Sequence, residues 1–518
     1  MSTTTPPDGT TGKGLRRDSV GLLASVALGL SSVAPAYSIA ATLGFVVMAV
    51  GDLAPAALLL GFVPILLTAF AFRELNRAMP DCGTTFVWNT RAFGPVAGWL
   101  TGGWTVQIAT LIAMAALAQV GSVYLLGLLG LDGLASKPAA VVVTAGLILA
   151  AVATVSYRGI RVAASVQYAM LALQLTALAA FGVAALAREG VATPSLAWLD
   201  PFAFGGVGPF AEAVVLCLFI YWGWDALITV NEETTDSGRT PGRAAVISTL
   251  VLLATYLFTA FAALGLAGTG TTGLGLGNEE TAADVLASLA PAALGPVAAK
   301  AVELAVCVSA VSALLTCLVS SPRAALSMAS HGALPRVFAR VHPRFGTPSQ
   351  GTVVFAAGAA AVLAVLSAVS ADFLGDAILS LGLLIALYYG VTGFACAWYF
   401  RATLRGSVRH LLVRGVLPVA GALMMLAALV RTSYDLLDPS YGYTSVGGVG
   451  GAFVLGAGAI VLGAVVMLLL RPRFPDFFRH GVTADAVGGT ATATATAETT
   501  GIPEITGTTA DTRTTSED

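Results

Sequence analysis

The stretch FIYWGWDALITV, from Phe219 to Val230, is apolar enough to lie deep in a bilayer, yet it carries Asp225 between Trp224 and Ala226. A charged side chain at the centre of a membrane helix costs about 2.5 to 3.5 kcal/mol on insertion scales, so such residues face an internal cavity, a partner or a substrate. The stretch therefore indicates a membrane-spanning segment with a functional polar residue at its centre.

Composition extends this interpretation to the whole chain. Of its 518 residues, 57% are hydrophobic and only 10% are charged, whereas soluble domains average about 25% charged residues. Apolar runs of about 20 residues, each long enough to cross the hydrocarbon core, recur from Val20 to Leu470. About twelve such runs predict an all-α polytopic membrane protein. The runs are too long and too uniformly apolar for the strands of a β-barrel.

The apolar runs also set the predicted organisation of the chain. The expected spans are residues 19–44, 52–72, 96–127, 138–157, 162–187, 209–231, 243–267, 297–321, 351–370, 375–400, 411–431 and 449–470. Residues 281–296 are weakly amphipathic and predict a short extracellular helix. Residues 1–18 and the Thr-rich tail 471–518 are expected to be disordered and cytoplasmic. The first apolar run is read as a retained helix and not as a signal peptide, because more spans follow at once.

Basic residues predict the orientation. If the N-terminus is inside and the spans alternate, only four of the 26 lysines and arginines fall outside: Lys137, Arg188, Lys300 and Arg431. This distribution satisfies the positive-inside rule and places both termini in the cytoplasm.

Two spans are interrupted in mid-membrane. The first reads LGLSSVAPAYSIAATLG from Leu28 to Gly44, where Pro35 removes a backbone donor and clashes with the preceding turn. The sixth has its weak point at Gly223. Each alone fits a packing kink equally well, but paired interruptions in repeated halves point to a transporter's binding site. An unwound turn offers a positive half-helix end, so a substrate carboxylate is expected near the first break.

Cysteines and histidines argue against metal and catalytic chemistry. The five cysteines form no CxxC pair, and the four histidines lie near span ends or in loops without metal-ligand spacing. No constellation for a membrane acyltransferase is present, and no GxxxxGK[ST] run indicates an ATP-driven pump. We therefore expect no enzyme activity, no cofactor, no metal and no nucleic-acid partner.

Three stretches, taken in chain order, carry a family signature. They are ELNRAMPDCGTTFVWNTRAFGPVAGWLTGGW (74–104), YWGWDALITVNEETTDSGRTPGRA (221–244) and SSPRAALSMASHGALPRVFARVHPRFGTP (320–348). They resemble the third-helix region, the sixth helix and the loop after the eighth helix of the amino acid/polyamine/organocation (APC) permease superfamily. The resemblance covers residues 19 to 430.

The resemblance implies an inverted repeat of five plus five helices, residues 19–187 and 209–402, with discontinuous helices one and six and two further helices over 411–470. It also implies alternating access around a midplane site between spans one, three, six, eight and ten. An amino acid's carboxylate would meet the first break, and its amine and side chain would meet the second. The implied contacts are Ser31, Ser32, Val33, Ala34 and Pro35, then Tyr221, Trp222, Gly223, Trp224 and Asp225.

Two departures from the family pattern bear on mechanism. The run SSVAP stands where many relatives carry glycines, which permit an unwound turn more readily than serines do. Gln174 stands where some proton-coupled relatives place a lysine. Because glutamine cannot titrate, that coupling route is expected to be missing.

Polar groups within the spans admit two roles each. Asp225 either contacts a substrate amine or a proton, or it fixes the broken helix. The aromatic side chains around it either form a lid or pack between helices. Gln107 either lines a pocket or joins helices, and the hydroxyls of Ser309, Ser312 and Thr316 either hold Na⁺ or mediate helix contacts.

Charged residues near the cytoplasmic span ends suggest a gate. Glu74, Glu232, Glu233 and Arg323 either form a salt-bridge network that opens and closes, or are solvated loop charges.

The leading hypothesis is a secondary transporter that imports amino acids with H⁺ across a bacterial cytoplasmic membrane, surrounded by lipid. The alternatives are a transporter or exchanger of polyamines or other organic amines, and a nutrient sensor that does not transport. A polyamine pocket needs more than one buried acid, whereas Asp225 is the one placed near mid-membrane. Glu212 and Glu303 lie nearer the outer span ends.

Overall fold

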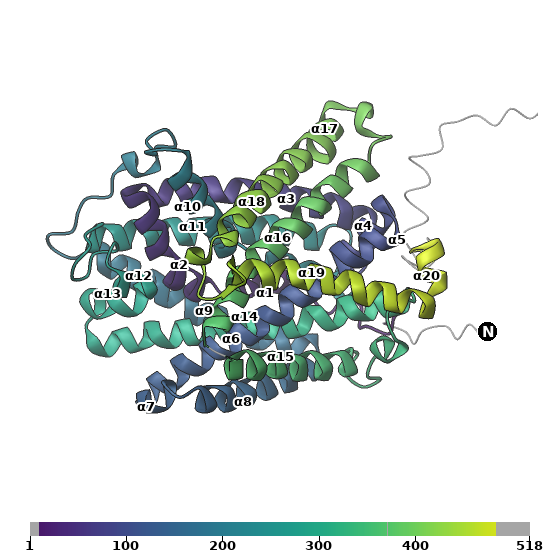
Figure 1. Cartoon of the computed structure of the whole chain (residues 1–518), viewed down its shortest axis with the longest axis horizontal. Coiled ribbons are helices and arrows are strands. Elements are labelled where there is room, and N and C mark those ends of the chain that lie inside the picture. The colour runs from purple at the N-terminus through teal and green to yellow at the C-terminus, as the bar shows by residue number, and fades with distance from the viewer. Residues whose placement is uncertain (1–9, 370, 483–518) are drawn as a thin grey trace, which may run out of the picture.

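The chain folds into a bundle of long helices, seen in a computed structural model that describes residues 10–369 and 371–482 (Figure 1). Its α-helices are α1 (Leu22–Ser32), α2 (Pro35–Val50), α3 (Ala54–Ala78), α4 (Thr85–Phe93), α5 (Pro95–Ala97), α6 (Thr105–Leu128), α7 (Asp132–Ala135), α8 (Pro138–Tyr157), α9 (Ile160–Leu186), α10 (Val207–Ile220), α11 (Thr240–Ala267), α12 (Glu279–Ala283), α13 (Val285–Leu294), α14 (Pro296–Ser330), α15 (Ser349–Val369), α16 (Ala371–Tyr399), α17 (Val408–Leu411), α18 (Leu417–Leu437), α19 (Gly451–Leu470) and α20 (Pro475–His480).

Short 3-10 and π-helical segments and one small hairpin complete the fold. The segments are η1 (Gly51–Leu53), η2 (Gly98–Trp104), η3 (Leu196–Leu199), η4 (Trp224–Glu233), η5 (Arg336–Ala339), η6 (Leu404–Gly406), η7 (Leu412–Val416), η8 (Pro439–Tyr441) and η9 (Arg471–Arg473). Strands β1 (Ser445–Val446) and β2 (Val449–Gly450) pair antiparallel. The predicted disorder of residues 1–9 and 483–518 concerns positions outside the described residues.

Eleven segments of the described chain are long and apolar enough to cross a membrane. The first, Leu22–Ala78, has 57 residues, which corresponds to about 85 Å of helix and exceeds what one crossing needs. The chain turns back at Gly51, which adopts φ +61°, so α1 with α2 makes one crossing and α3 makes the next. The prediction of an all-α polytopic protein is confirmed, with crossings for the twelve expected spans.

The first span breaks where the sequence predicts. α1 ends at Ser32, and α2 begins at Pro35, which suits a first helical position because the N–H that it lacks would have no helical partner. Between them, Ala34 adopts a left-handed conformation with φ +52° and ψ +62°, which is uncommon for a residue other than glycine. Val33 and Ala34 therefore interrupt the helix inside the bundle, where both are buried.

The sixth span breaks at Gly223. α10 ends at Ile220, and from Trp224 the chain continues as the ten-residue 3-10 helix η4. Gly223 has φ +111°, and a Cβ atom there would lie 2.8 Å from the backbone carbonyl oxygen of Ser32. Glycine suits both this conformation and this approach. The two breaks therefore lie against each other.

The two halves of the bundle place their short helices at opposite ends. After the second span of each half, the chain forms α4 in the first half and α12 with α13 in the second, and these lie at opposite ends of the molecule (Figure 1). An inverted repeat requires this arrangement. The helix predicted at 281–296 corresponds to α12 and α13, and α12 packs so closely on α2 that a Cβ on Gly44 would lie 2.2 Å from the Cα atom of Ala282.

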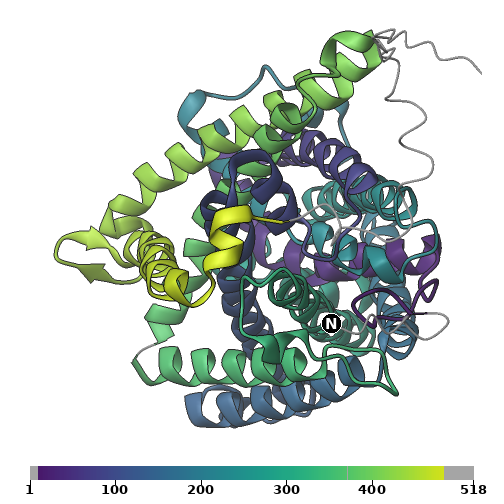
Figure 2. The same cartoon turned by 90° about the vertical axis from the view of Figure 1, so that its right-hand side faces the viewer.

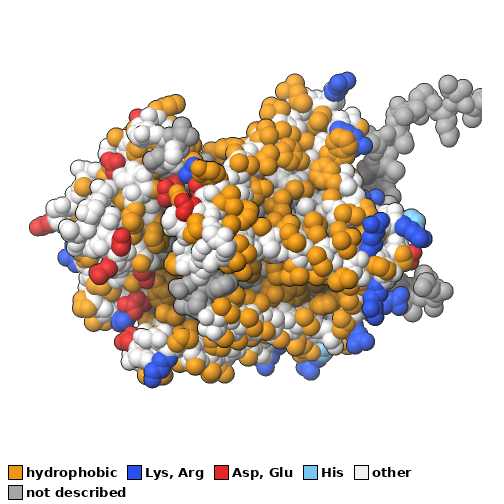
Figure 3. All heavy atoms as spheres, in the orientation of Figure 1, with side chains coloured by type: hydrophobic (Ala, Val, Ile, Leu, Met, Phe, Trp, Pro, Cys, Tyr) orange, Lys and Arg blue, Asp and Glu red, His pale blue; other side chains and the backbone are white. Residues whose placement is uncertain are grey.

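Charged side chains gather at the two ends of the bundle, and its sides are largely apolar (Figure 3). Lysine and arginine dominate the end that carries α5 and α20, which we call the basic end. Aspartate and glutamate dominate the end that carries α12 and α13, which we call the acidic end. An apolar belt between two charged ends is the surface expected of a protein that spans a membrane.

Both ends of the described chain lie at the basic end (Figure 2). Residues 10–18, part of the predicted disordered N-terminus, form turns and a bridge between Thr10 and Arg16. They are ordered because Leu15 is fully buried among neighbouring helices. Residues 471–482, part of the predicted disordered C-terminal tail, are likewise ordered and include η9 and α20. Phe477 of α20 stacks on Phe86 of α4 with ring centroids 5.5 Å apart.

Candidate functional site

A cavity lies beside the two helix breaks, between α4, α6, η4, α14 and α16. Of the residues that the sequence assigned to substrate binding, those that line this cavity are Ser32, Val33, Ala34, Gln107, Trp222, Gly223 and Asp225. Those that do not line it are Ser31, Pro35, Tyr221 and Trp224. The structure thus brings most of the predicted binding residues around one space.

Asp225 supplies the cavity's negative charge. Its Oδ1 accepts a hydrogen bond from the Tyr389 hydroxyl at 2.8 Å, and its Oδ2 accepts one from the Tyr388 hydroxyl at 3.2 Å. Trp222 Nε1 in turn donates to the Tyr388 hydroxyl at 2.6 Å. Within the described residues, Asp225 is the one carboxylate that lines the cavity, and no lysine or arginine does. An uncompensated carboxylate in such a space attracts a cationic group.

Sequence reasoning missed Tyr388 and Tyr389, which project from α16, the tenth span. The only available signal was the pair YY within the apolar run LLIALYYGV. Such a pair marks two adjacent hydroxyls but does not reveal which helix face they occupy. Both side chains are buried, and their phenol groups from α16 donate to the carboxylate on η4.

The first break is stabilised by serine side chains. The Ser38 hydroxyl donates to the Val33 carbonyl oxygen at 2.6 Å, which satisfies a backbone acceptor that the break exposes. Ser309 Oγ of α14 accepts hydrogen bonds from the backbone N–H groups of Ala36 and Tyr37, at 3.2 Å each. Ser309 therefore caps the N-terminus of α2, as a side-chain oxygen does at many helix starts.

The remaining hydroxyls of the predicted ion site pair with α9. Ser312 Oγ donates to Gln167 Oε1 at 2.6 Å, and Gln167 Nε2 donates to Thr316 Oγ1 at 2.7 Å. These bonds join α14 to α9 in the manner of polar contacts between membrane helices. On the same α9, both amide atoms of Gln174 are buried and have no hydrogen-bond partner within the described structure.

The aromatic residues of the sixth span divide between cavity and core. Trp222 lines the cavity. Tyr221 is fully buried and donates to the Leu58 carbonyl oxygen at 3.2 Å. Trp224 packs against Phe72 with ring centroids 5.3 Å apart. An aromatic lid would thus consist of Trp222 alone, while Tyr221 and Trp224 pack around the break.

Gln107 combines both roles that the sequence left open. It lines the cavity, and its Nε2 donates to the Ser321 carbonyl oxygen of α14 at 3.1 Å. Its Oε1 is buried and has no hydrogen-bond partner within the described structure. Because an unpaired buried acceptor is costly, this oxygen is a candidate contact for a donor group on the substrate.

The four residues predicted to form a gate occupy three places. Glu233 accepts hydrogen bonds from Arg323 in a fully buried pair that joins η4 to α14. Glu232 pairs with Lys13 at 2.6 Å. Glu74 pairs instead with Arg73 and with Arg414 of η7 at 3.0 Å, so it lies outside the network.

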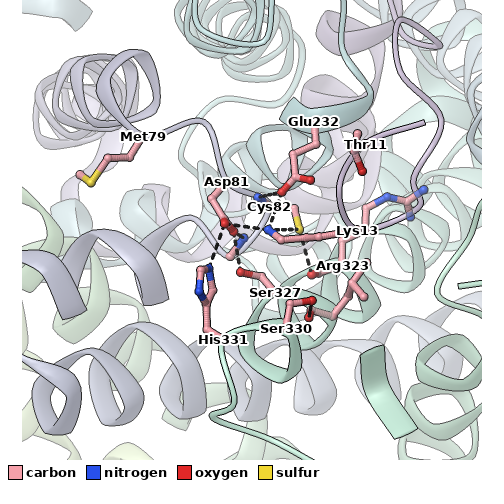
Figure 4. Close-up of polar contacts among 12 residues, drawn as sticks. Thr11, Lys13, Met79, Asp81, Cys82, Glu232, Arg323, Ser327, Ser330 and His331 are labelled. Atoms are coloured by element: carbon pink, nitrogen blue, oxygen red, sulfur yellow. Dashed lines mark hydrogen bonds and ion pairs between the residues drawn. The ribbon is translucent and has the colours of Figure 1, made fainter. Parts of the chain in front are cut away.

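Lys13 occupies the centre of a polar cluster at the basic end (Figure 4). Its Nζ lies 2.7 Å from Asp81 Oδ2 and 2.6 Å from Glu232 Oε1, and Cys82 Sγ lies 3.7 Å away. His331 Nε2 lies 3.1 Å from Asp81 Oδ2. We call these five residues the Lys13 cluster.

Burial and charge act in opposite directions in the Lys13 cluster. Burial alone would lower the pKa of Lys13, but the nearby Asp81 and Glu232 carboxylates raise it well above its ordinary value. Burial would raise the pKa of Asp81, but Lys13 and His331 together hold it far below its usual range. The ammonium and this carboxylate are therefore charged in the closed cluster.

At the acidic end, one contact ties α6 to the short helices. The Tyr124 hydroxyl donates to Asp284 Oδ2, and Asp284 Oδ1 accepts from the Ala287 N–H at 3.0 Å. Burial raises the pKa of Asp284 above its ordinary value, against the lowering effect of these hydrogen bonds.

A cavity beside two broken helices is the architecture that the resemblance to the APC superfamily implies, and comparison with known proteins agrees. A family model described as amino acid permease matches residues 20–437. The chain belongs to this family. The family lies within the APC superfamily, so the family predicted from the three sequence motifs is confirmed.

The relatives of this permease are transporters with varied substrates. An uncharacterized transporter of Mycobacterium bovis is 29% identical over 358 residues, which cover 67% of this chain and 74% of the relative. Cationic amino acid transporter 4 of Mus musculus is 28% identical over 329 residues, which cover 59% of this chain and 49% of the relative. The low-affinity putrescine importer PlaP of Escherichia coli is 24% identical over 253 residues, which cover 47% of this chain and 53% of the relative.

The family and its relatives confirm a multi-pass membrane transporter of amino acids or related substrates, and not an enzyme.

Proposed function

We propose that this permease imports amino acids together with H⁺ by alternating access, and that Asp225 receives the substrate's amine. The observation that carries the proposal is the charge of the cavity, where Asp225 is the one carboxylate among the described lining residues and faces no lysine or arginine. A substrate ammonium would neutralise this carboxylate through charge-assisted hydrogen bonds.

The two tyrosines prepare the carboxylate for this role. Tyr388 and Tyr389 each donate one hydrogen bond to Asp225. An ionised carboxylate has about four acceptor positions, and the Asp225 backbone N–H occupies a third, so about one remains for an ammonium group. Because the phenols fix the orientation of the carboxylate, less conformational entropy is lost when the substrate binds.

The substrate carboxylate would lie at the first break. Val33 and Ala34 line the cavity immediately before α2, whose N-terminus carries positive partial charge. One observation favours a second candidate, an organic amine without a carboxylate such as a polyamine. Ser309 already accepts the first-turn N–H groups of Ala36 and Tyr37, which leaves fewer donors for a substrate anion.

We further propose that the basic end faces the cytoplasm of a bacterium, as the positive-inside rule requires, with both termini on that side. Asp225 cannot hold the coupling proton while it binds the substrate ammonium, and Gln174 cannot titrate, so another group has to carry the proton. The hydroxyls proposed earlier as Na⁺ ligands, Ser309 and Ser312, have protein partners, which favours H⁺.

Uptake by reconstituted protein tests these proposals. The permease in liposomes is given labelled amino acids, and separately labelled putrescine, under an imposed H⁺ or Na⁺ gradient. We expect H⁺-driven amino acid uptake that Asp225→Asn abolishes. Asp52→Asn is the matched control, because Asp52 is exposed and does not line the cavity.

Three other outcomes of the uptake experiment would change the proposal. Uptake of putrescine alone replaces the amino acid proposal with the amine alternative. Full activity of Asp225→Asn removes this residue from substrate binding. Binding without uptake of any substrate supports a sensor.

A further inference from the structure

The segment before the first span is folded onto the basic end of the transport domain. Leu15 is fully buried and packs with Cys82 and Leu326. The backbone N–H groups of Ser19 and Val20 both donate to the carbonyl oxygen of Glu233, at 2.8 and 3.0 Å. The segment therefore attaches to η4, the second half of the broken sixth span.

Lys13 projects from this segment between the two inverted repeats. Asp81 lies in the loop between α3 and α4 and belongs to the first repeat, whereas Glu232 lies in the last turn of η4 and belongs to the second. Both carboxylates lie within 2.7 Å of the Lys13 Nζ atom (Figure 4). One ammonium thus bridges parts of the chain that alternating access has to separate.

The α14 helix completes the cluster around Asp81. The Ser327 hydroxyl donates to Asp81 Oδ1, and the buried imidazole of His331 lies against Oδ2. The Asp81 side chain also accepts from the Gly83 N–H at 2.7 Å, which fixes the loop. Asp81 therefore stays in place, while Lys13 is the one partner that comes from outside the two repeats.

The bridge involves two elements that also line the cavity. Gly83 and Thr84, which follow Cys82 in the loop, line the cavity, as does Thr229 of η4. This loop and η4 therefore both border the cavity. The Lys13 cluster joins them through Asp81 and Glu232.

Without the ammonium, the same groups would repel. The ligand atoms of Asp81, Cys82 and Glu232 all lie within 4.8 Å of one another. Two carboxylates at such a separation in a largely buried site destabilise each other. Withdrawal of Lys13 would therefore remove this compensation and weaken the contact between the loop and η4, which two direct hydrogen bonds also hold. These run from the Cys82 N–H to Glu232 Oε1 and from Asn231 Nδ2 to the Asp81 carbonyl oxygen, at 3.0 Å each.

We propose that Lys13 is a gating residue, whose ammonium locks the basic end of the permease shut and whose release permits the cavity to open there. This inference rests on the chain being a transporter and is independent of which substrate it carries.

Cys82 provides a native reporter for the test. Its side chain is fully buried in the locked cluster. In a variant whose other four cysteines, Cys217, Cys307, Cys317 and Cys396, are alanine, alkylation of Cys82 by N-ethylmaleimide requires the lock to open. The rate is measured on purified full-length protein in detergent, so no substrate is needed.

Lys13→Met removes the charge and keeps an unbranched side chain. We expect alkylation of Cys82 to accelerate by about tenfold or more, which corresponds to about 1.4 kcal/mol. Lys13→Arg, which keeps the charge, should retain most of the protection. Lys300→Met is the matched control, because Lys300 pairs with Glu303 in an exposed contact within α14, and it should leave the rate unchanged.

A second variant keeps the test decisive if Lys13→Met does not fold. Glu232→Gln removes one half of the bridge and leaves Lys13 paired with Asp81. It should raise the alkylation rate by a smaller factor than Lys13→Met. Wild-type alkylation rates in every folded variant of this pair would overturn the proposal.

Failure of this proposal and failure of the proposed function are distinguishable. An unchanged alkylation rate concerns the lock alone, whereas uptake by the Asp225 variant concerns the cavity alone.

Discussion

Removing either partner of the Glu233–Arg323 pair should destabilise the permease strongly. The two side chains are almost completely excluded from solvent, with exposed fractions of 0% and 1%. Arg323 makes two hydrogen bonds to the carboxylate, of which the one from Nη2 to Oε1 measures 3.1 Å, and its Nη1 donates to the Val319 carbonyl oxygen at 2.6 Å. Glu233→Gln or Arg323→Met therefore leaves a buried group without its partner.

The magnitude follows from the cost of an unpaired buried charge. Removing one partner of a buried ion pair costs about 3 to 5 kcal/mol, so each single variant should lose this much free energy of unfolding. The double variant, Glu233→Gln with Arg323→Met, has no unpaired charge and should lose less than the sum of the two. We expect a coupling energy of about 2 kcal/mol or more.

Unfolding in mixed detergent and sodium dodecyl sulfate micelles, followed by tryptophan fluorescence, measures these free energies. Lys300→Met serves as a control, because its ion pair with Glu303 is exposed and surface pairs contribute little. Single variants within about 1 kcal/mol of wild type, or strictly additive losses, would refute the reasoning.

Three further predictions concern the break in the sixth span, the basic end and the acidic end. Gly223→Ala introduces a Cβ atom 2.8 Å from the Ser32 carbonyl oxygen at a φ of +111°, so we expect a loss of about 1 to 3 kcal/mol and of uptake, measured by thermal melting and transport in liposomes. Phe477→Ala removes the ring stacked on Phe86 and should cost up to about 3 kcal/mol, visible as a lower melting temperature. Burial raises the pKa of Asp284, so the folded state binds this proton more tightly than the unfolded state, and stability falls as the pH rises from the ordinary aspartate pKa through the raised one. The melting temperature of wild type, relative to Asp284→Asn, should therefore increase when the pH is lowered from about 7 to the ordinary aspartate pKa, and an unchanged difference would contradict this account.

Much of the fold follows from local features of the sequence. Apolar runs of membrane-spanning length predict the crossings because a bilayer core has a fixed thickness. The two breaks could be placed to within a few residues because Pro35 lacks a donor and Gly223 tolerates positive φ. These effects act within a few residues of chain, so no knowledge of the packing is needed.

The site was harder to predict because it depends on how helices rotate against one another. Trp222 faces the cavity, whereas Trp224, two residues on, faces the core. Hydrophobic periodicity cannot predict this difference in a run that is apolar on all sides. Tyr388 reaches Asp225 across 163 sequence positions. Lys13 was assigned to a disordered terminus because its flanking residues are polar, and its buried partners lie 68 and 219 positions away.

The 3-10 winding of η4 affects its length. Its ten residues, Trp224–Glu233, are wound as a 3-10 helix, although runs longer than about four residues are uncommon. A 3-10 helix of this length measures about 20 Å, and the same residues wound as an α-helix would measure about 15 Å. Asp225 lies in its first turn and Glu232 in its last. Rewinding η4 as an α-helix would therefore shorten the segment by about 5 Å and bring Glu232 at the basic end closer to Asp225 in the cavity.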